Sequence, residues 1–353
     1  MNQDFPLALS YDDVLLIPQY SEIDSRSEID LTTKISPNLT LKIPLISTKM
    51  DTVTGVEMAI EMGKLGGMGI LPRFESIESQ ADKVSRVAKA GVPAACAVGV
   101  KNGFLERAEI LIRAGATVID IDVAHGHMQK TLEATQMLKN KFGNSITILA
   151  GIVATYEAAK DLYESGADSL LVGVGAGSIC ITRIETGFGL PGFSSLIETS
   201  KAARELNKTF MPDAGIRNSG DIVKALGAGA SAIVGGFIFA GSEETPGELI
   251  EIKEKLFKKY NGSASFAEKT KHTKLIKDEV NSNYVKQVEG VESFVAYKGP
   301  LKNVVEKLLA GIRSGLSYGG AKNIPDFWSK AKFVRITPGG LKESNVHDVL
   351  TSQ

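Results

Sequence analysis

Residues 145–175, SITILAGIVATYEAAKDLYESGADSLLVGVG, contain one complete strand–helix–strand unit. Short apolar runs at 145–151 and 169–175 enclose a segment, 156–167, in which apolar residues recur with helical spacing. Gly166 follows the last periodic residue, as a helix C-cap would. Both runs are apolar throughout rather than alternating, which is typical of strands buried on both faces of a parallel sheet.

The same unit recurs along the chain. Further runs of this kind, separated by segments with helical spacing, lie at 42–50, 67–72, 94–100, 117–123, 209–215 and 231–237. Eight such strands predict a closed (β/α)8 barrel, a TIM barrel of about 200 residues in the α/β class. An open doubly wound sheet is the alternative, because periodicity alone does not show that the sheet closes.

Two segments fall outside the repeat. Residues 1–41 precede the first strand, and we expect them to cover the bottom face of the barrel. Residues 256–300 form a long polar insertion after the eighth strand, on the side where barrel loops build active sites. Such an insertion is typical of a mobile flap, the alternative being a disordered surface loop. We therefore expect a single catalytic barrel domain over residues 1–353.

The charge balance favours small-molecule chemistry. The chain has 40 basic and 41 acidic residues, so no strong field would attract nucleic acid or an anionic membrane. No apolar run reaches the roughly 18 residues that a membrane span needs. Two cysteines cannot form a disulfide framework, and the first residues, MNQDFPLALSYDD, do not resemble a secretory signal. We expect a soluble cytoplasmic protein.

The C-terminal ends of the strands of such a barrel converge on one pocket. The candidate residues there are mostly polar or glycine: Ser47, Met50, Asp51, Asp122, His125, His127, Asp213, Gly215, Gly235 and Gly236. Glycines after the seventh and eighth strands allow backbone N–H groups to approach a phosphate. A carboxylate at Asp213 would repel that phosphate but would accept hydrogen bonds from a ribose diol. These parts predict a nucleotide, the alternative being glycines that only serve tight turns.

The stretch GVGAGSICITR, at 173–183, places Cys180 in a glycine-rich loop after the sixth strand. Exposure and backbone dipoles there could favour the thiolate, so Cys180 is either a nucleophile or an inert loop cysteine. Thr182 could pass protons if a carboxylate activated it. Cys96, in the middle of AACAV, is most simply a core residue. His125 and His127 lack a third ligand nearby and do not predict a metal site.

Long motifs distributed over nearly the whole chain match those of a known family. They are YDDVLLIPQYSEIDSRS, PLISTKMDTVTG, DVAHGH, GVGAGSICITR, DAGIRNSGDIVKALGAGA, FAGSEETPGE, YKGPLKNVVEKLLAGIRSGLSYGGAKNI and KFVRITPGGLKESNVHDV. Together they resemble the IMP dehydrogenase and GMP reductase family. The resemblance implies a TIM barrel, usually tetrameric, that acts on a purine nucleoside monophosphate with NAD(H) or NADP(H).

The resemblance also implies a mechanism and its residues. The loop cysteine, Cys180, would attack C2 of the base to form a covalent thioimidate, while a hydride moves between C2 and the nicotinamide. Thr182 would help to handle protons, and Glu289 in the VEG motif would pair with it. The expected substrate-binding residues are Ser47, Met50, Ser178, Asp213, Ala214, Gly215, Gly235, Gly236, Tyr260, Asn261, Gly262, Ser263 and Ala264.

The remaining implied residues concern the cofactor and a cation. The expected cofactor-binding residues are Asp122, Gly173, Val174 and Gly175. Potassium (K+) is expected at the backbone carbonyls of Gly175, Gly177 and Cys180, and in dehydrogenases a neighbouring subunit completes the site with residues that match Glu343, Ser344 and Asn345.

The direction of the reaction depends on the flap. In the resembled family, dehydrogenases carry an Arg-Tyr pair whose arginine activates water to hydrolyse the thioimidate. Residues 266–288 contain no arginine, and Asn283-Tyr284 is the nearest approach, although asparagine cannot act as that base. CITRIETGFG, YNGSAS, Gly236 and the absence of a regulatory insert resemble the reductase branch, whereas SEETPGE and the C-terminal motifs resemble a dehydrogenase.

We therefore predict a GMP reductase, which converts GMP and NADPH to IMP, ammonia and NADP. The alternative is an IMP dehydrogenase, which converts IMP, NAD and water to XMP and NADH. Three departures from the family pattern predict lowered activity or changed specificity: Ile152 in place of Asn, Ala176 in place of Pro and Ala214 in place of Gly. A homologue that binds nucleotide without turnover is accordingly a third alternative.

Overall fold

The computed structural model describes residues 5–276 and 285–348. Within them, eight parallel strands form one sheet: β4 Leu45–Ser47, β5 Met68–Leu71, β6 Ala94–Val98, β7 Val118–Asp122, β8 Thr147–Val153, β9 Ser169–Val172, β10 Thr209–Pro212 and β11 Ile233–Gly235. Each of these strands overlaps one of the eight runs that the sequence predicts. The strand order in the sheet is β10-β9-β8-β7-β6-β5-β4-β11, which is sequential apart from β11.

This sheet closes into a barrel. β4 pairs in parallel with both β5 and β11, so the first and last strands are neighbours. At the remaining junction, the amide of Ser231 beside β11 donates to the carbonyl of Phe210 in β10 at 3.0 Å. The predicted (β/α)8 barrel is confirmed, and the open doubly wound sheet is wrong.

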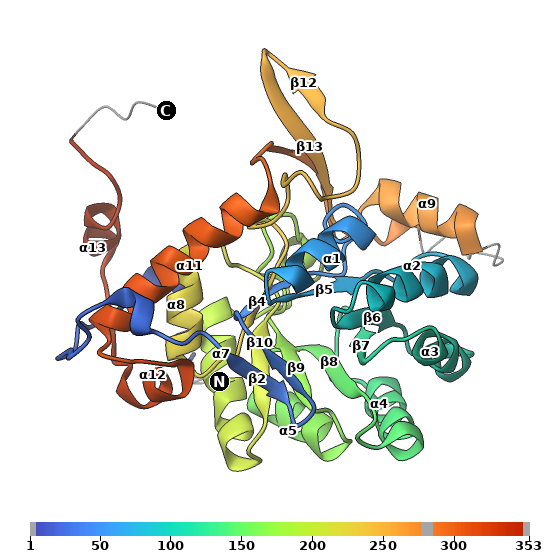
Figure 1. The fold of residues 1–353 in the computed structure, drawn as a ribbon, viewed down its shortest axis with the longest axis horizontal. Helices are drawn as coiled ribbons and strands as arrows, with labels where there is room; N and C mark the ends of the chain where they lie inside the picture. Colours follow the sequence, from blue (N-terminus) through green and yellow to red (C-terminus); the bar gives the residue numbers. More distant parts are fainter. Residues whose placement is uncertain (1–4, 277–284, 349–353) are drawn as a thin grey trace.

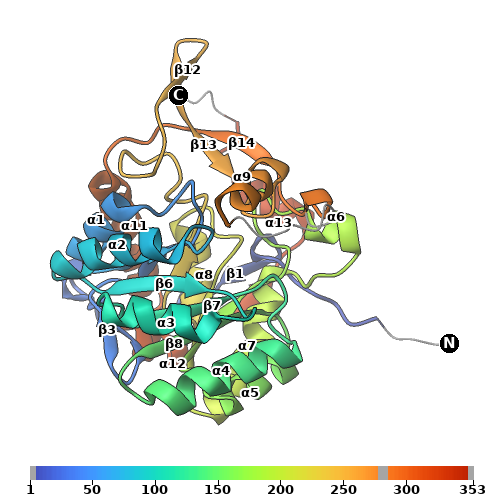
Figure 2. The same cartoon turned by 90° about the vertical axis from the view of Figure 1, so that its right-hand side faces the viewer.

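Helices surround the strands on all sides (Figures 1 and 2). Those of the ring are α1 Val56–Lys64, α2 Ile77–Lys89, α3 Phe104–Arg113, α4 Gln129–Phe142, α5 Tyr156–Glu164, α7 Gly192–Glu205, α8 Ser219–Gly227 and α11 Leu301–Tyr318. Gly166 has a φ of 110°, a left-handed conformation that favours glycine and ends α5 where the sequence predicts. α11 packs against α8 and α1 and so completes the ring.

The strands separate an outer core from an inner core. In β7, Ile119 and Ile121 face the helices, whereas Val118 faces the barrel interior. Because side chains alternate along a strand, Asp120 and Asp122 also point inward. Cys96 in β6 is buried in the outer core, as predicted, and burial raises the pKa of its thiol to about 12. β7 therefore directs two carboxylates toward the barrel axis.

Only one part of the N-terminal segment covers the bottom of the barrel. β2 Thr33–Ser36 and β3 Leu39–Leu41 form an antiparallel hairpin whose apolar side chains join the inner core. This hairpin closes the bottom, as predicted for residues 1–41. The preceding elements lie elsewhere, because β1 Val14–Leu16 pairs with β15 Phe333–Arg335 near the C-terminus. The remaining terminal elements are η1 Tyr11–Asp13, η2 Arg26–Glu28, α12 Ile324–Lys330 and α13 Pro338–Glu343.

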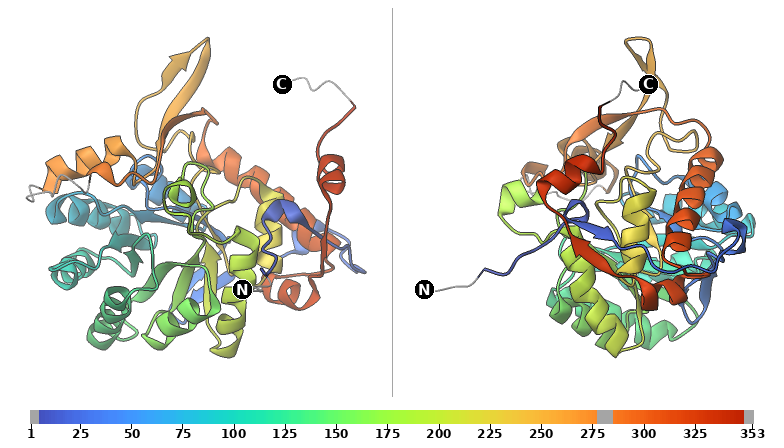
Figure 3. Two further views of the ribbon diagram at one scale, coloured as in Figure 1. Left: turned by 180° about the vertical axis from the view of Figure 1, so that it is seen from behind. Right: turned by 90° about the vertical axis from the view of Figure 1, so that its left-hand side faces the viewer.

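The insertion between β11 and α11 has regular secondary structure in its described part. β12 Ile250–Ile252, β13 Lys255–Asn261 and β14 Glu292–Ala296 form an antiparallel sheet, and the β12–β13 ribbon projects beyond the barrel (Figure 3). Helix α9, Phe266–Ile276, follows β13. Mobility of this flap stays a prediction, and Asn283-Tyr284 lies outside the described residues. No helix in the described ranges is long and apolar enough to cross a membrane.

Candidate active site

A cavity of about 400 Å³ opens at the C-terminal ends of the barrel strands, a size suited to a small-molecule ligand. Most of the residues predicted from the sequence line it: Met50, Asp122, Ile152, Gly173, Val174, Gly175, Gly177, Ser178, Cys180, Thr182, Asp213, Ala214, Gly215, Gly235, Gly236, Tyr260, Gly262, Ser263, Ala264 and Glu289. The strand ends and the flap therefore meet around one space.

Some predicted residues do not line this cavity. Ser47 is fully buried, because Ile46 takes the inward position in β4 and the serine hydroxyl accepts a hydrogen bond from Thr54 at 2.9 Å. The side-chain amide of Asn261 donates to Glu268 at 3.0 Å instead of facing the cavity. Three further residues lie at the end of α13, away from the cavity of this chain: Glu343, Ser344 and Asn345.

The predicted catalytic residues form a continuous hydrogen-bonded chain. Cys180 Sγ lies 3.2 Å from Thr182 Oγ1, and the threonine hydroxyl donates to Glu289 Oε2 at 2.6 Å. Thr182 begins the short helix α6, Thr182–Thr186, whereas Glu289 comes from the flap segment before β14. The amide of Ile181 donates to the carbonyl of Glu289 at 2.9 Å, so backbone pairing fixes the position of the carboxylate.

This arrangement is suited to moving a proton to or from a thiol-bound ligand. The thiolate is the nucleophilic form of cysteine, and a hydroxyl can donate one hydrogen bond while it accepts another. Cys180 is a half-buried free thiol at the cavity wall, and the carboxylate of Glu289 lies at the far end of the chain. Thr182 therefore connects the predicted nucleophile, Cys180, to the carboxyl group of Glu289.

A buried lysine that the sequence analysis missed also lines the cavity. The ammonium of Lys49, just after β4, lies 2.5 Å from Asp213, 3.2 Å from Asp120 and 4.0 Å from Asp122. Arg73, after β5, also pairs with Asp122, at 2.9 Å. Three carboxylates from β7 and the loop after β10 therefore face two cations. We call these five residues the charged cluster.

The charges of this cluster depend on one another. Burial by itself lowers the pKa of Lys49, but Asp120, Asp213 and Asp122 outweigh it and raise the pKa overall. Burial raises the pKa of Asp120 to about 7, against the opposing effect of Lys49. Burial also raises the pKa of Asp213, although Lys49 and Thr48 act against it. Near neutral pH a proton on Asp120 would leave two carboxylates facing two cations.

Asp213 retains the capacity to bind ligand hydroxyls. Its Oδ2 contacts Lys49, and its Oδ1 accepts the hydroxyl of Thr48 at 3.0 Å. Each carboxylate oxygen has two lone pairs, so each can accept a further hydrogen bond. The predicted contact with a ribose diol is compatible with this position at the cavity wall.

Two glycines of the predicted phosphate end, Gly235 and Gly236, leave no room for side chains. A Cβ atom at Gly236 would lie 2.8 Å from the hydroxyl of Tyr260, and one at Gly235 would lie 2.4 Å from Ile238. Both positions therefore expose bare backbone to the cavity, as an anion site requires. Ala214 also lines this wall, so its methyl group faces any ligand bound there.

The residues expected to bind potassium fit a cation only in part. The carbonyl of Gly177 accepts the amide of Cys180 at 3.2 Å, which leaves one lone pair free on that oxygen. Hard cations take about six or more oxygen ligands, so three carbonyls from this loop are too few. A complete site would need oxygens from elsewhere, such as the neighbouring subunit that the sequence prediction invokes.

The barrel and its cavity with a free cysteine define a TIM-barrel protein with a candidate active site at the C-terminal ends of its strands. Residues 8–347 match the family model of the IMP dehydrogenase / GMP reductase domain, and the chain belongs to this family. The family uses NAD or NADP as cofactor and acts on IMP or GMP.

The proteins similar to this chain include dehydrogenases and a reductase. Inosine-5'-monophosphate dehydrogenase of Cryptosporidium parvum is 37% identical, covering 97% of this chain and 95% of its own. The same enzyme of Nitrosopumilus maritimus is 33% identical, covering 98% and 99%. Among solved structures, GMP reductase of Trypanosoma brucei in complex with guanosine 5'-monophosphate has a TM-score of 0.91 at 29% identity, covering 98% of this chain and 99% of its own.

Proposed function

We propose that this protein is a GMP reductase that uses NADPH. The observation that carries the proposal is a complete Cys180–Thr182–Glu289 chain beside a flap segment, 266–288, that contains no arginine. Both reactions of the family need a nucleophile and a path for protons, whereas only the dehydrogenase must also activate water. The GMP complex of the T. brucei reductase supports the same direction.

In the proposed reaction, the thiolate of Cys180 attacks C2 of guanine. The bond from C2 to the amino nitrogen breaks, and ammonia leaves with a proton that Glu289 delivers through Thr182. The cofactor supplies a hydride to C2 when it is bound. The C2–S bond then breaks and the thiolate returns. One hydride and one proton are consumed, so GMP and NADPH give IMP, ammonia and NADP.

The chain offers groups for both ligands around this centre. Asp122 Oδ2 accepts a hydrogen bond from Arg73 at 2.9 Å, and the carboxylate has further lone pairs that can accept hydrogen bonds from the ribose hydroxyls of a cofactor. Gly235 and Gly236 present backbone to the phosphate of GMP. Ile152 gives the cavity an apolar wall that cannot hydrogen-bond a base, which would lower affinity or change specificity.

An absorbance assay at the reduced-nicotinamide band tests the proposal. Purified protein with GMP and NADPH should lose absorbance as NADPH is consumed, and ammonia should form in equal amount. A rise in absorbance with IMP, NAD and potassium would instead establish the dehydrogenase, which the names of the curated relatives favour. No change in either mixture, together with tight GMP binding, would favour a homologue without turnover.

A further inference from the structure

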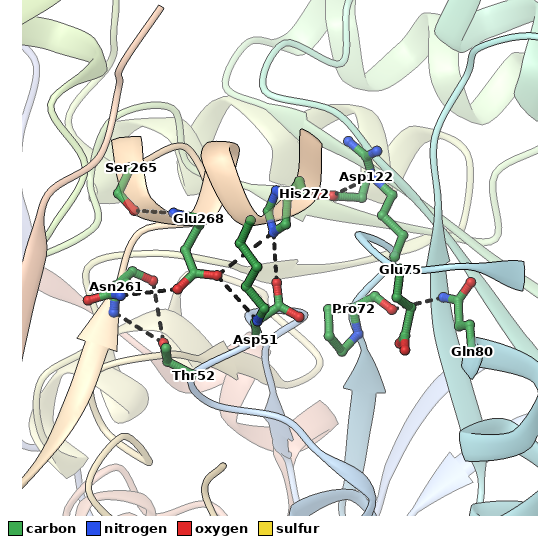
Figure 4. Close-up of polar contacts among 12 residues, drawn as sticks. Asp51, Thr52, Pro72, Glu75, Gln80, Asp122, Asn261, Ser265, Glu268 and His272 are labelled. Carbon is green, nitrogen blue, oxygen red and sulfur yellow. Dashed lines mark hydrogen bonds and ion pairs between the residues drawn. The ribbon is translucent and has the colours of Figure 1, made fainter. Parts of the chain in front are cut away.

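Three side chains that can ligate metals converge beside the nucleotide cavity (Figure 4). Asp51 follows β4, whereas Glu268 and His272 lie four residues apart on one face of α9. His272 Nε2 lies 3.0 Å from Asp51 Oδ2 and 3.8 Å from Glu268 Oε2. The ligand atoms of all three lie within 4.8 Å of one another. The barrel rim and the flap helix therefore share one cluster.

The cluster is shielded from water and is not fully satisfied. His272 is 1% exposed and Glu268 is 6% exposed. Glu268 Oε2 is buried and accepts no hydrogen bond from the described residues, and the ammonium of the half-exposed Lys271 lies 3.7 Å from it. Burying an anionic oxygen without a close donor is costly. A cation between the carboxylates and the imidazole would remove this cost.

Neighbouring groups hold the three side chains in place. The amide of Asn261 donates to the other carboxylate oxygen, Glu268 Oε1, at 3.0 Å, and this bond turns Oε2 toward His272. The imidazole stacks on Phe74, with ring centroids 3.9 Å apart and an angle of 5° between the planes. Partners that fix ligand orientation in this way are typical of metal sites.

We propose that Asp51, Glu268 and His272 bind one divalent transition-metal ion. One imidazole nitrogen and two carboxylate oxygens suit Zn²⁺, whereas Mg²⁺ and Ca²⁺ prefer oxygen ligands alone. Two ligand atoms about 2.05 Å from a tetrahedral zinc lie roughly 3.3 Å apart. The observed separations of 3.0 and 3.8 Å bracket this value, so small side-chain shifts would complete the site.

Such an ion would fasten the flap helix to the barrel rim. α9 begins two residues after Ala264, which lines the cavity, and His272 stacks on Phe74, which lines it as well. None of the three ligands lines the cavity itself. The ion would therefore have a structural role and would be bound whichever reaction the cavity performs.

Isothermal titration calorimetry with Zn²⁺ alone tests the site on full-length protein freed of metal by chelation. We expect one ion per chain, with affinity at least roughly 100-fold lower in Glu268→Gln and in His272→Asn. His127→Asn is the matched control, because that imidazole pairs with Asp161 on the partly exposed barrel surface. It should bind zinc like the wild type, as should Cys180→Ser.

Limited trypsin digestion of the wild type provides a test that needs no variant. Zinc at about 100 times its dissociation constant should slow cleavage after the lysines of α9 by up to about 100-fold, because it binds only the folded helix. Absence of zinc binding, equal affinity in the ligand variants, equal binding of Mg²⁺, or zinc binding without protection of α9 would each overturn the proposal.

Discussion

The two walls of the cavity are built in different ways. Cys180 and Thr182 belong to one loop, and backbone pairing brings Glu289 to them. The charged cluster instead collects Lys49, Arg73 and three aspartates from separate strand ends. The catalytic chain is linked by hydrogen bonds through the hydroxyl of Thr182, whereas the charged cluster is held together by ion pairs between carboxylates and cations. We therefore expect changes to the first wall to affect chemistry and changes to the second to affect stability, together with the ligand contacts proposed for Asp122 and Asp213.

The largest expected effect is the loss of chemistry in Cys180→Ala. Without the thiol no covalent bond to C2 can form, and turnover should fall by roughly 10⁴-fold or more. GMP should still bind measurably by calorimetry, because the glycine-rich backbone and Asp213 are unchanged. Full activity in this variant would contradict a covalent mechanism.

Cys96→Ala is the matched control for the nucleophile. Cys96 is fully buried in β6 and its thiol pKa is raised to about 12, so it is not a thiolate at neutral pH. Activity should be retained, with a loss of about 1 kcal/mol in the free energy of unfolding from the small cavity left behind. An inactive but folded Cys96→Ala protein would assign chemistry to the wrong cysteine.

Features built from contiguous residues could be predicted from the sequence, whereas features built from distant residues could not. The barrel was predictable because each strand and helix is marked by its own local pattern, as in residues 145–175. The glycine-rich loop with Cys180 and Thr182 is likewise contiguous, and a long family motif covers it. Such features need no knowledge of distant contacts.

The residues that sequence reasoning missed, and the predicted residues that do not line the cavity, depend on side-chain direction and on distant partners. Ser47 stands at a strand end but points outward, because Ile46 takes the inward position. The side-chain amide of Asn261 donates a hydrogen bond to Glu268, seven residues further along the chain. Lys49 ends a run of small and apolar residues, and its partner Asp213 is 164 residues away. A lysine at a barrel strand end was the available signal for the charged cluster.

Lys49→Met should destabilise the folded protein, because it removes the central cation of the charged cluster. Removing the ammonium leaves three carboxylates, of which Asp122 is partly exposed, with Arg73 as the remaining cation of the cluster, and we expect a loss of about 3 kcal/mol in the free energy of unfolding at pH 8. The loss should be smaller at pH 5, because Asp120 and Asp213 can then take up protons. Urea denaturation at the two pH values measures both effects.

Lys139→Met is a control for that substitution. Lys139 also pairs with a buried carboxylate, Asp168, at 3.0 Å, but its side chain is 26% exposed and Asp168 keeps a hydrogen bond from the amide of Ile148. The expected loss is about 1 kcal/mol. Equal losses in the two variants would show that the charged cluster has no special dependence on Lys49.

The smallest expected effect concerns the proton on Asp120. The folded protein holds this proton more tightly than the unfolded chain, because burial raises the pKa of Asp120 from 3.8 to about 7. The contribution of Asp120 to stability is therefore present below about pH 4 and is lost as the pH rises toward 7. In Asp120→Asn no such proton is released.

The wild type should therefore lose stability between pH 5 and pH 8 as Asp120 releases its proton, whereas Asp120→Asn should not. The free energy of unfolding of Asp120→Asn minus that of the wild type should rise by about 2 kcal/mol over this pH range. Asp82→Asn, at a carboxylate that is 69% exposed, should show no comparable change. A difference that stays constant with pH would mean that Asp120 is ionised throughout. Lys49 and Arg73 would then face three carboxylate charges, and the cluster would be an anionic wall rather than a balanced one.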